Sequence, residues 1–220
     1  STTGGMGRPH VSGFGVEAIA DDGDHHLDGD HCMGDIAVDG VIDLVEIGRG
    51  GFSVVYRGVE EELNRHVAVK VIQGTLDDRG RERFDRERRA MGALSGHPNI
   101  VTVHRSGYLD DSSPYIVMEY LEGGSLDRRI ETEGPLPWDQ VVEVGISVAG
   151  ALESAHELGV LHRDIKPGNL LHGPSGVTKL ADFGIARIAG SPETTSRTIT
   201  ASLAHAAPEV IDGKRPSVAA

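Results

Sequence analysis

The chain has 220 residues, of which 38% are hydrophobic and 25% are charged, proportions that are ordinary for one medium-sized globular domain. Its 21 Lys and Arg residues against 34 Asp and Glu residues give a net charge of −13, which argues against a general nucleic-acid-binding protein. The single cysteine, Cys32, excludes an internal disulfide and fits a reducing, cytoplasmic setting. No apolar run of about 18 residues predicts a membrane span, and the chain does not open with a signal-peptide pattern.

Residues 1–40 differ in composition from the rest of the chain. One base, Arg8, stands against eight acidic residues, so this segment carries a charge of −7 (1 − 8): Glu17, Asp21, Asp22, Asp24, Asp28, Asp30, Asp35 and Asp39. Such a segment buries too little apolar surface to offset its ordering entropy, and we expect a disordered acidic extension rich in Gly, His and Asp. The histidines at 25, 26 and 31 lie near Cys32 and several acids, which suggests a divalent-metal site. Their spacing is irregular, however, and we favour solvated disorder.

The first elements expected after this extension are strands. Residues 41–46 are apolar and β-prone, a glycine-rich turn follows at 48–51, and residues 52–57 return to strand character. Residues 67–72 form a third apolar run, which predicts another strand.

A helix is expected over residues 79–94, and its apolar side consists of Phe84, Met91 and Leu94. The helix ends before Pro98, because the residue preceding a proline avoids helical torsions. Two further strands are expected at 101–103 and 115–120.

The second half of the chain has a helical pattern after Gly123 and Gly124. Apolar residues recur at helical spacing and predict one long helix over residues 141–158, which ends near Gly159. Its expected buried face consists of Val141, Val142, Ile146, Ala149, Leu152 and Ala155. A strand-rich first half and a helical second half predict a two-lobed α+β fold.

Two motifs in the strand-rich half suggest phosphate binding. The turn at residues 48–55 reads GRGGFSVV, and glycines let backbone amides approach phosphate oxygens, although a tight hairpin turn explains the pattern equally well. Its position between two strands disfavours a dinucleotide-binding fold. Lys70 ends the run at 67–69 and is either a phosphate-binding cation or a sheet-edge residue with its charge in solvent. Glu87 is either an ion-pair partner of Lys70 or part of a solvated, arginine-rich helix face.

Three motifs in the second half are far more specific. They are His162-Arg163-Asp164, which continues through Lys166 to Asn169, then Asp182-Phe183-Gly184, and finally Ala207-Pro208-Glu209. Together with the glycine turn, the strand lysine and the helix glutamate, they stand in the order typical of eukaryotic-type protein kinases. From about residue 43 to residue 220 the chain resembles the Ser/Thr branch of that family, and its bacterial members closely.

The resemblance implies a protein-kinase-like α+β fold. An N-lobe with a small antiparallel β-sheet and one helix is expected at about residues 41–121, and a mainly helical C-lobe at about 122–220. The family's domain continues with further helices, so we expect the C-lobe to be incomplete and the chain to be a fragment with low stability and weak or absent activity.

The resemblance also implies an ATP site. Lys70, held by Glu87, would bind the α- and β-phosphates, and residues 119–121 would form the hinge whose backbone pairs with the adenine. Met118 would guard the space behind the hinge. The other nucleotide-binding positions implied are Gly48, Gly50, Gly51, Ser53, Val55, Ala68, Glu119, Leu121 and Leu171, with Ser53 in the place of the family's third glycine.

Catalytic roles follow from the same resemblance. Asp164 would orient the substrate hydroxyl and accept its proton, and Lys166 would steady the transferring phosphoryl group. Asn169 and Asp182 would hold two Mg²⁺ ions, since hard oxygen ligands suit that cation. The implied partners are ATP, Mg²⁺ and proteins with Ser or Thr acceptors, and the Lys166 position is the main indication of Ser/Thr over Tyr substrates.

The resemblance also implies regulation through the activation loop. Arg163 would bind a phosphate on the activation loop at residues 182–209, and autophosphorylation is expected at Thr194, Thr195 or Thr198, against the alternative that these hydroxyls are incidental. An activating homodimer is a further expectation from the resemblance. A pseudokinase or a nucleotide-binding scaffold fragment is the alternative to an active Ser/Thr kinase. Pseudokinases usually lack a residue equivalent to Lys70, Asp164 or Asp182, and this chain has all three.

Overall fold

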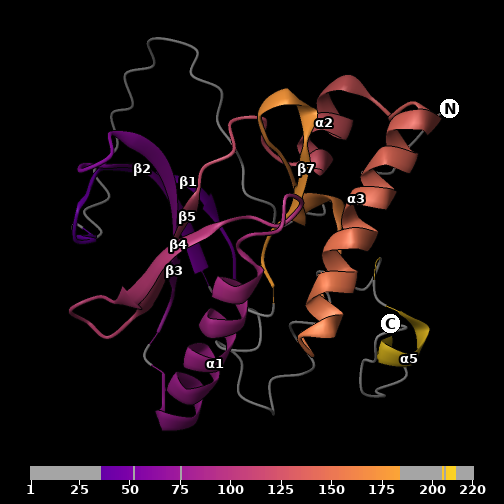
Figure 1. Cartoon of the computed structure of the whole chain (residues 1–220). Coiled ribbons are helices and arrows are strands. Elements are labelled where there is room, and N and C mark those ends of the chain that lie inside the picture. The colour runs from indigo at the N-terminus through magenta and orange to yellow at the C-terminus, as the bar shows by residue number, and fades with distance from the viewer. Residues whose placement is uncertain (1–35, 52, 75, 184–204, 206, 212–220) are drawn as a thin grey trace, which may run out of the picture.

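The computed structural model describes residues 36–51, 53–74, 76–183, 205 and 207–211. These residues form a sheet-rich lobe, coloured indigo to magenta in Figure 1, and a second lobe with two longer helices and a short hairpin. This is the α+β, two-lobed architecture that the sequence predicts. No helix in the described ranges is long and apolar enough to cross a membrane.

The first lobe is built on a five-stranded antiparallel sheet with the strand order β1-β2-β3-β5-β4. Its strands are β1 (Val41–Arg49), β2 (Ser53–Glu60), β3 (Arg65–Ile72), β4 (Val103–Tyr108) and β5 (Pro114–Glu119). One helix, α1 (Asp78–Leu94), covers a face of this sheet, and it begins where the Asp77 carboxylate accepts a hydrogen bond from the Gly80 amide at 2.7 Å.

The central strand β3 is buried on both faces, and its alternation sorts side chains by function. Val67, Val69 and Val71 point to one face and form an aliphatic cluster with Val117. The intervening Ala68 and Lys70 point to the other face, toward α1 and the second lobe. The sheet therefore presents Lys70 on the face where the lobes meet, and a buried valine cluster covers the opposite face.

The fourth strand differs from its expected place. The sequence predicts a strand at 101–103, but β4 begins at Val103. The residues before it bond to the second lobe instead: the Val101 amide donates to the Leu180 carbonyl at 3.0 Å, and the Leu180 amide donates to the Asn99 carbonyl at 2.8 Å. The apolar run at this position thus serves as a link between the lobes.

The second lobe contains α2 (Leu126–Glu133), α3 (Trp138–Glu157) and an antiparallel hairpin of β6 (Leu170–His172) and β7 (Thr178–Leu180). Short 3₁₀ turns occur at Pro167–Asn169 and Pro174–Gly176, and a short helix, α5, spans Pro208–Ile211. The long helix α3 packs against β7. The hairpin lies in the chain between Asn169 and Asp182, so it joins the two motifs that these residues belong to.

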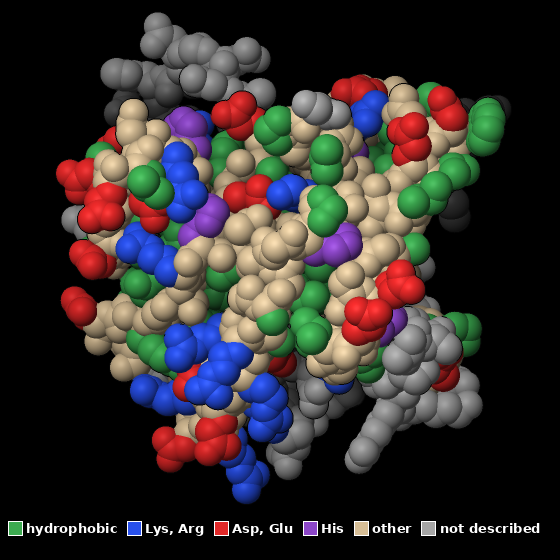
Figure 2. Space-filling view, viewed as in Figure 1, with side chains coloured by type: hydrophobic (Ala, Val, Ile, Leu, Met, Phe, Trp, Pro, Cys, Tyr) green, Lys and Arg blue, Asp and Glu red, His purple; other side chains and the backbone are tan. Residues whose placement is uncertain are grey.

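The predicted buried face of α3 is wrong in its first half and confirmed near its end. Val141, Val142 and Ile146 are exposed by 53%, 49% and 69%, whereas Leu152 packs against the core and Ala155 is fully buried, as is Ala151. Helical spacing identifies an apolar stripe, but the choice of the packed side depends on how closely a partner approaches, and the small alanines allow the closer approach. Figure 2 shows apolar side chains gathered on the surface over α3, at the upper right.

Residues 36–38, which the sequence places in the acidic extension, pack on the sheet. Val38 is 4% exposed, contacts the valine cluster behind β3 and forms a bridge with Val41. Residues 1–35, including Cys32 and the neighbouring histidines, lie outside the described residues.

Phe84 offers a test of how α1 is held to the sheet. Its side chain is 0% exposed and packs edge-on against Tyr108 of β4, with ring centroids 5.5 Å apart. Phe84→Ala should lower the free energy of unfolding by about 3–5 kcal/mol, because it removes buried area and leaves a cavity. The measurement is urea unfolding followed by circular dichroism. Leu63→Ala, at a position 62% exposed, is the control and should stay within about 0.5 kcal/mol of wild type.

Candidate functional site

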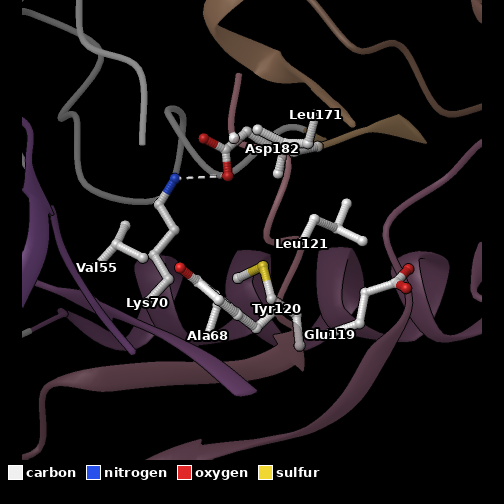
Figure 3. Close-up of a pocket in the computed structure, with 11 residues that line it drawn as sticks. Val55, Ala68, Lys70, Glu119, Tyr120, Leu121, Leu171 and Asp182 are labelled. Atoms are coloured by element: carbon white, nitrogen blue, oxygen red, sulfur yellow. Dashed lines mark ion pairs between the residues drawn. The ribbon is translucent and has the colours of Figure 1, made fainter. Parts of the chain in front are cut away.

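A pocket lies where the two lobes meet. Its lining consists of Val55, Ala68, Lys70, Met118, Glu119, Tyr120, Leu121, Gly124, Leu171, Ala181 and Asp182, most of which Figure 3 labels. The structure therefore brings together residues from β2, β3, β5 and the hairpin that the sequence predicts for an adenine and phosphate site. It adds Gly124 and Ala181, to which the sequence assigned no role.

The glycine turn lies at the end of β1 and the start of β2. Gly48 pairs with Val55 in the β1–β2 ladder, and the Gly50 amide donates to the Ser53 carbonyl at 2.7 Å. Of the residues predicted in this turn and strand, Val55 lines the pocket, whereas Gly51 is exposed. The role of the glycines in phosphate binding stays a prediction.

Lys70 forms an ion pair across the pocket. Its Nζ lies 2.7 Å from Oδ1 of Asp182, a residue of the second lobe, as the dashed line in Figure 3 marks. Lys70 as a whole is 7% exposed, so the pair partly neutralises a cation that is largely removed from solvent. The pairing of Lys70 with Glu87 stays a prediction, and the two residues implied for phosphate and metal binding are in direct contact here.

Asp164 is held by two neighbours in its own loop. Lys166 Nζ lies 2.9 Å from Asp164 Oδ2, and Asn169 Nδ2 donates to the same oxygen at 3.1 Å and to the Asp164 carbonyl at 2.7 Å. Asn169 is 2% exposed. The three residues that the sequence implies for proton transfer, phosphate steadying and metal binding thus form one hydrogen-bonded group.

His162 fixes this loop to the segment after β7 that contains Asp182. Its Nε2 lies 2.6 Å from the Ala181 carbonyl, and its Nδ1 accepts from the Asp164 amide at 3.2 Å. Burial lowers the pKa of His162, and the hydrogen bond to Ala181 opposes this only in part. The neutral ring, protonated at Nε2, satisfies both contacts, so His162 is a positioning residue that sets the backbone around Asp164.

The segment that leaves the hinge rests directly on β6. The His172 amide donates to the Gly124 carbonyl at 2.9 Å. A Cβ at Gly123 would lie 2.6 Å from the His172 carbonyl oxygen, so only glycine fits this approach. Of the two glycines that the sequence reads only as a break before the helix, Gly124 lines the pocket and Gly123 allows the close approach to β6.

Comparison with known proteins identifies the family. The protein kinase domain model matches residues 42–220. This chain belongs to the protein kinase family. It is 53% identical over 180 residues to the serine/threonine-protein kinase PknK of Mycobacterium tuberculosis, covering 82% of this chain and 16% of that relative. It is 38% identical over 190 residues to the probable serine/threonine-protein kinase PknB of Lactococcus lactis, covering 84% of this chain and 30% of that relative.

Solved structures agree with the fold of this kinase-family chain. The crystal structure of the Mycobacterium tuberculosis PknI kinase domain superposes with a TM-score of 0.63 at 29% identity, covering 83% of this chain and 69% of that one. The antiparallel sheet with one helix and the neighbouring helical lobe are thus the kinase-family N-lobe and part of its C-lobe. The chain spans 16% of the length of the PknK relative.

The kinase-family site fits a divalent cation only together with further oxygen ligands. Asn169 and Asp182 supply an amide and a carboxylate oxygen, which are the ligand types that Mg²⁺ prefers. Since both hydrogen bonds of the Asn169 amide use its nitrogen, Oδ1 is the atom left for a metal. The described residues contain no group of three or more His, Cys, Asp or Glu that would bind a metal unaided. Phosphate oxygens of a nucleotide would complete the coordination.

The predicted phosphorylation positions of the activation loop, Thr194, Thr195 and Thr198, lie outside the described residues.

His162 gives a prediction for the dependence of stability on pH. Because burial lowers its pKa below the ordinary 6.5 in the folded chain, the unfolded chain takes up a proton first as the pH falls through 6.5. Stability is therefore full above pH 6.5 and decreases below it. His104 and His172, whose pKa values burial also lowers, act in the same direction.

The measurement is urea unfolding at a series of pH values between 7.5 and 5.5. His162→Gln should be less stable at pH 7.5 and should lose less further stability on acidification than wild type. His66→Gln, at an exposed position on β3, keeps the buried His162 and should retain the wild-type pH dependence. An unchanged slope in His162→Gln would show that the ring does not titrate differently on unfolding.

Proposed function

We propose that this chain is a catalytic segment of a Ser/Thr protein kinase, which transfers the γ-phosphoryl group of ATP to Ser or Thr hydroxyls of proteins. One observation carries the proposal: Asp164, held by Lys166 and Asn169, is tied through His162 to the same strand that places Asp182 opposite Lys70. The loop that holds the proton acceptor is therefore hydrogen-bonded to the segment that brings Asp182 to Lys70 in the pocket. Phosphoryl transfer needs positioning and charge neutralisation more than covalent chemistry from the protein.

The apolar part of the pocket is suited to a flat base. Val55 and Ala68 from the sheet lobe and Leu171 from the hairpin are buried side chains in its lining. Residues 119–121 run along the edge of the pocket, where backbone amides and carbonyls give directional hydrogen bonds to an adenine. The polar end with Lys70 and Asp182 then receives the phosphates.

Binding of a nucleotide exchanges the partners of the buried ion pair. Lys70 would then contact phosphate oxygens in place of Asp182 Oδ1, and the Asp182 carboxylate would be available to hold Mg²⁺. Each charge gains a new opposite charge as it loses the old one, so the exchange leaves no buried charge without a counter-ion. The Mg²⁺ ions supply neutralisation of the charge on the phosphates.

Asp164 acts on the acceptor hydroxyl. Its carboxylate accepts the proton that leaves the Ser or Thr oxygen as that oxygen attacks phosphorus, and the ammonium of Lys166 offsets negative charge next to it. Asn169 donates one hydrogen bond to this carboxylate and one to the backbone carbonyl of Asp164, which together limit the orientation of the carboxylate. The relatives' names as serine/threonine-protein kinases support hydroxyl acceptors of this class.

Asp164→Asn tests the proton acceptor. The substitution keeps the size of the side chain but removes the base, and phosphate transfer to casein should fall by about 10²- to 10⁴-fold. Binding of a fluorescent ATP analogue should be retained, since Asp164 is not part of the pocket lining. Lys70→Met should instead weaken nucleotide binding and transfer together.

The control for both variants is the thermal melt, which should match wild type within a few degrees. The transfer assay is run on this chain and on a longer chain that includes the further C-lobe helices expected from the family. If the longer chain binds the ATP analogue but transfers no phosphate to casein or to itself, the alternative of a nucleotide-binding scaffold is correct and the kinase proposal fails.

Autophosphorylation of the activation loop is part of the same proposal. After incubation with ATP and Mg²⁺, peptide mass spectrometry should locate phosphate on Thr194, Thr195 or Thr198. The triple substitution of these threonines by alanine should remove that signal, and Asp164→Asn should show none. Phosphate found only outside residues 184–204 would contradict this assignment.

A further inference from the structure

A second ion pair joins the lobes behind the nucleotide pocket. Lys179 Nζ, on β7 of the C-lobe, lies 2.6 Å from Oε1 of Glu119, the last residue of β5 in the N-lobe. The same oxygen accepts the Thr102 amide at 2.6 Å. The two side chains are 17% and 22% exposed, so the contact is largely shielded from solvent.

Glu119 is ionised in this setting. Burial alone raises its pKa, but hydrogen bonds from Lys179 and Thr102 outweigh that effect and leave the pKa below its ordinary value of 4.5. At neutral pH the contact is therefore a charge-assisted hydrogen bond between opposite charges, which is stronger than a neutral one.

The backbone around this ion pair is tied across the lobes as well. Residues 99–101 bond to Leu180 of β7 by two backbone hydrogen bonds, and Asn99 Nδ2 donates to the Thr178 carbonyl at 2.9 Å. Lys179 lies between these two β7 residues, on the opposite side of the strand from their buried side chains. The pair with Glu119 thus closes a ring of contacts that includes β7, the start of β4 and the end of β5.

Glu119 is also the first residue of the segment 119–121 that lines the pocket. Figure 3 shows its carboxylate turned away from Lys70 and Asp182, so it leaves the phosphate end of the pocket free of a further negative charge. The outward carboxylate instead anchors the hinge backbone to the β6–β7 hairpin. Leu171 lies in β6, and Ala181 and Asp182 directly follow β7. The distance between the hinge and the hairpin, which forms the floor of the pocket, therefore depends on the ion pair between Glu119 and Lys179.

We propose that Lys179 is a positioning residue of the nucleotide site: through Glu119 it holds the hinge at a fixed distance from the hairpin floor, so that the adenine slot is formed before ATP binds. The inference rests on the proposed function, since it requires ATP in this pocket. Lys179 itself lies outside the pocket lining and touches no reacting group. Preformation of a slot improves affinity by removing the ordering cost from the binding step, and it leaves the chemical step unchanged.

The central variant is Lys179→Met, which keeps the length of the side chain but removes the charge. Its Kd for a fluorescent ATP analogue and its KM for ATP should rise by about three- to tenfold, while kcat and the KM for casein stay within about twofold of wild type. Lys179→Arg keeps the cation and should restore wild-type affinity. Glu119→Gln keeps an acceptor for the Thr102 amide and should show a smaller loss in the same direction.

The matched control is Arg65→Met. Arg65 Nε lies 2.7 Å from Glu60 Oε2, so this variant also removes a paired cation, but one whose partner lies in the same lobe. It should leave the Kd for the ATP analogue unchanged. Thermal melts identify any variant that loses its fold, and Glu119→Gln provides the test if Lys179→Met does not fold.

Two results would overturn the inference. The first is an unchanged Kd in Lys179→Met with a wild-type melt, which would make the pair a surface contact without a role in the pocket. The second is a rise in kcat in that variant, which would show that the pair restrains turnover. A wild-type chain that binds no ATP analogue would instead contradict the proposed function itself, and that outcome is visible before any variant is made.

Discussion

The backbone from residue 178 to residue 183 is hydrogen-bonded to both lobes, and the geometry of the site depends on those bonds. The amide and carbonyl of Leu180 bond to Asn99 and Val101 at the base of the N-lobe. The next residue, Ala181, receives a hydrogen bond from buried His162 on its carbonyl and donates its amide to the Asn169 carbonyl. This short segment thus connects the sheet lobe to the loop that holds Asp164.

The charges across the pocket follow from the same constraint. Because this strand continues into Asp182, the carboxylate reaches Lys70 on the central strand of the sheet at 2.7 Å. A largely buried ammonium without a counter-ion would be costly, so the pair stabilises the empty pocket. Under the proposed function this ion pair would compete with the nucleotide, and the affinity for ATP would reflect the difference between two sets of ionic contacts.

The sequence predicts the parts of the site that local pattern determines. Ala68 and Lys70 follow from the position of the lysine at the end of a β-prone run, because alternation in a strand puts them on one face. Asp164, Lys166 and Asn169 lie within one short loop, so their proximity needs no knowledge of the rest of the fold. Lys179 and Gly124 could not be recognised in this way, since their roles depend on how the hairpin of the C-lobe meets β5 and the hinge.

The two errors in the fold have a related physical origin. A period-3.6 pattern shows that α3 has an apolar stripe, yet the side that packs is the one with Ala151 and Ala155, where small side chains let β7 approach. The apolar run that suggests a strand at 101–103 is real, but its first amide finds a partner on β7 before β4 begins. In both cases a tertiary neighbour decides between arrangements that the local pattern allows equally.

The exposed side of α3 has a spectroscopic consequence. The chain has one tryptophan, and that residue, Trp138, opens α3 with 79% of its surface exposed. Its indole is already in contact with water in the folded chain, so its emission should change little when the core unfolds. The same indole stands next to Val141 and Val142 on the uncovered face of the helix, and its emission should shift to the blue when another surface covers them. Intrinsic fluorescence in this protein therefore reports on contacts made by α3 and is a poor indicator of whether the domain is folded.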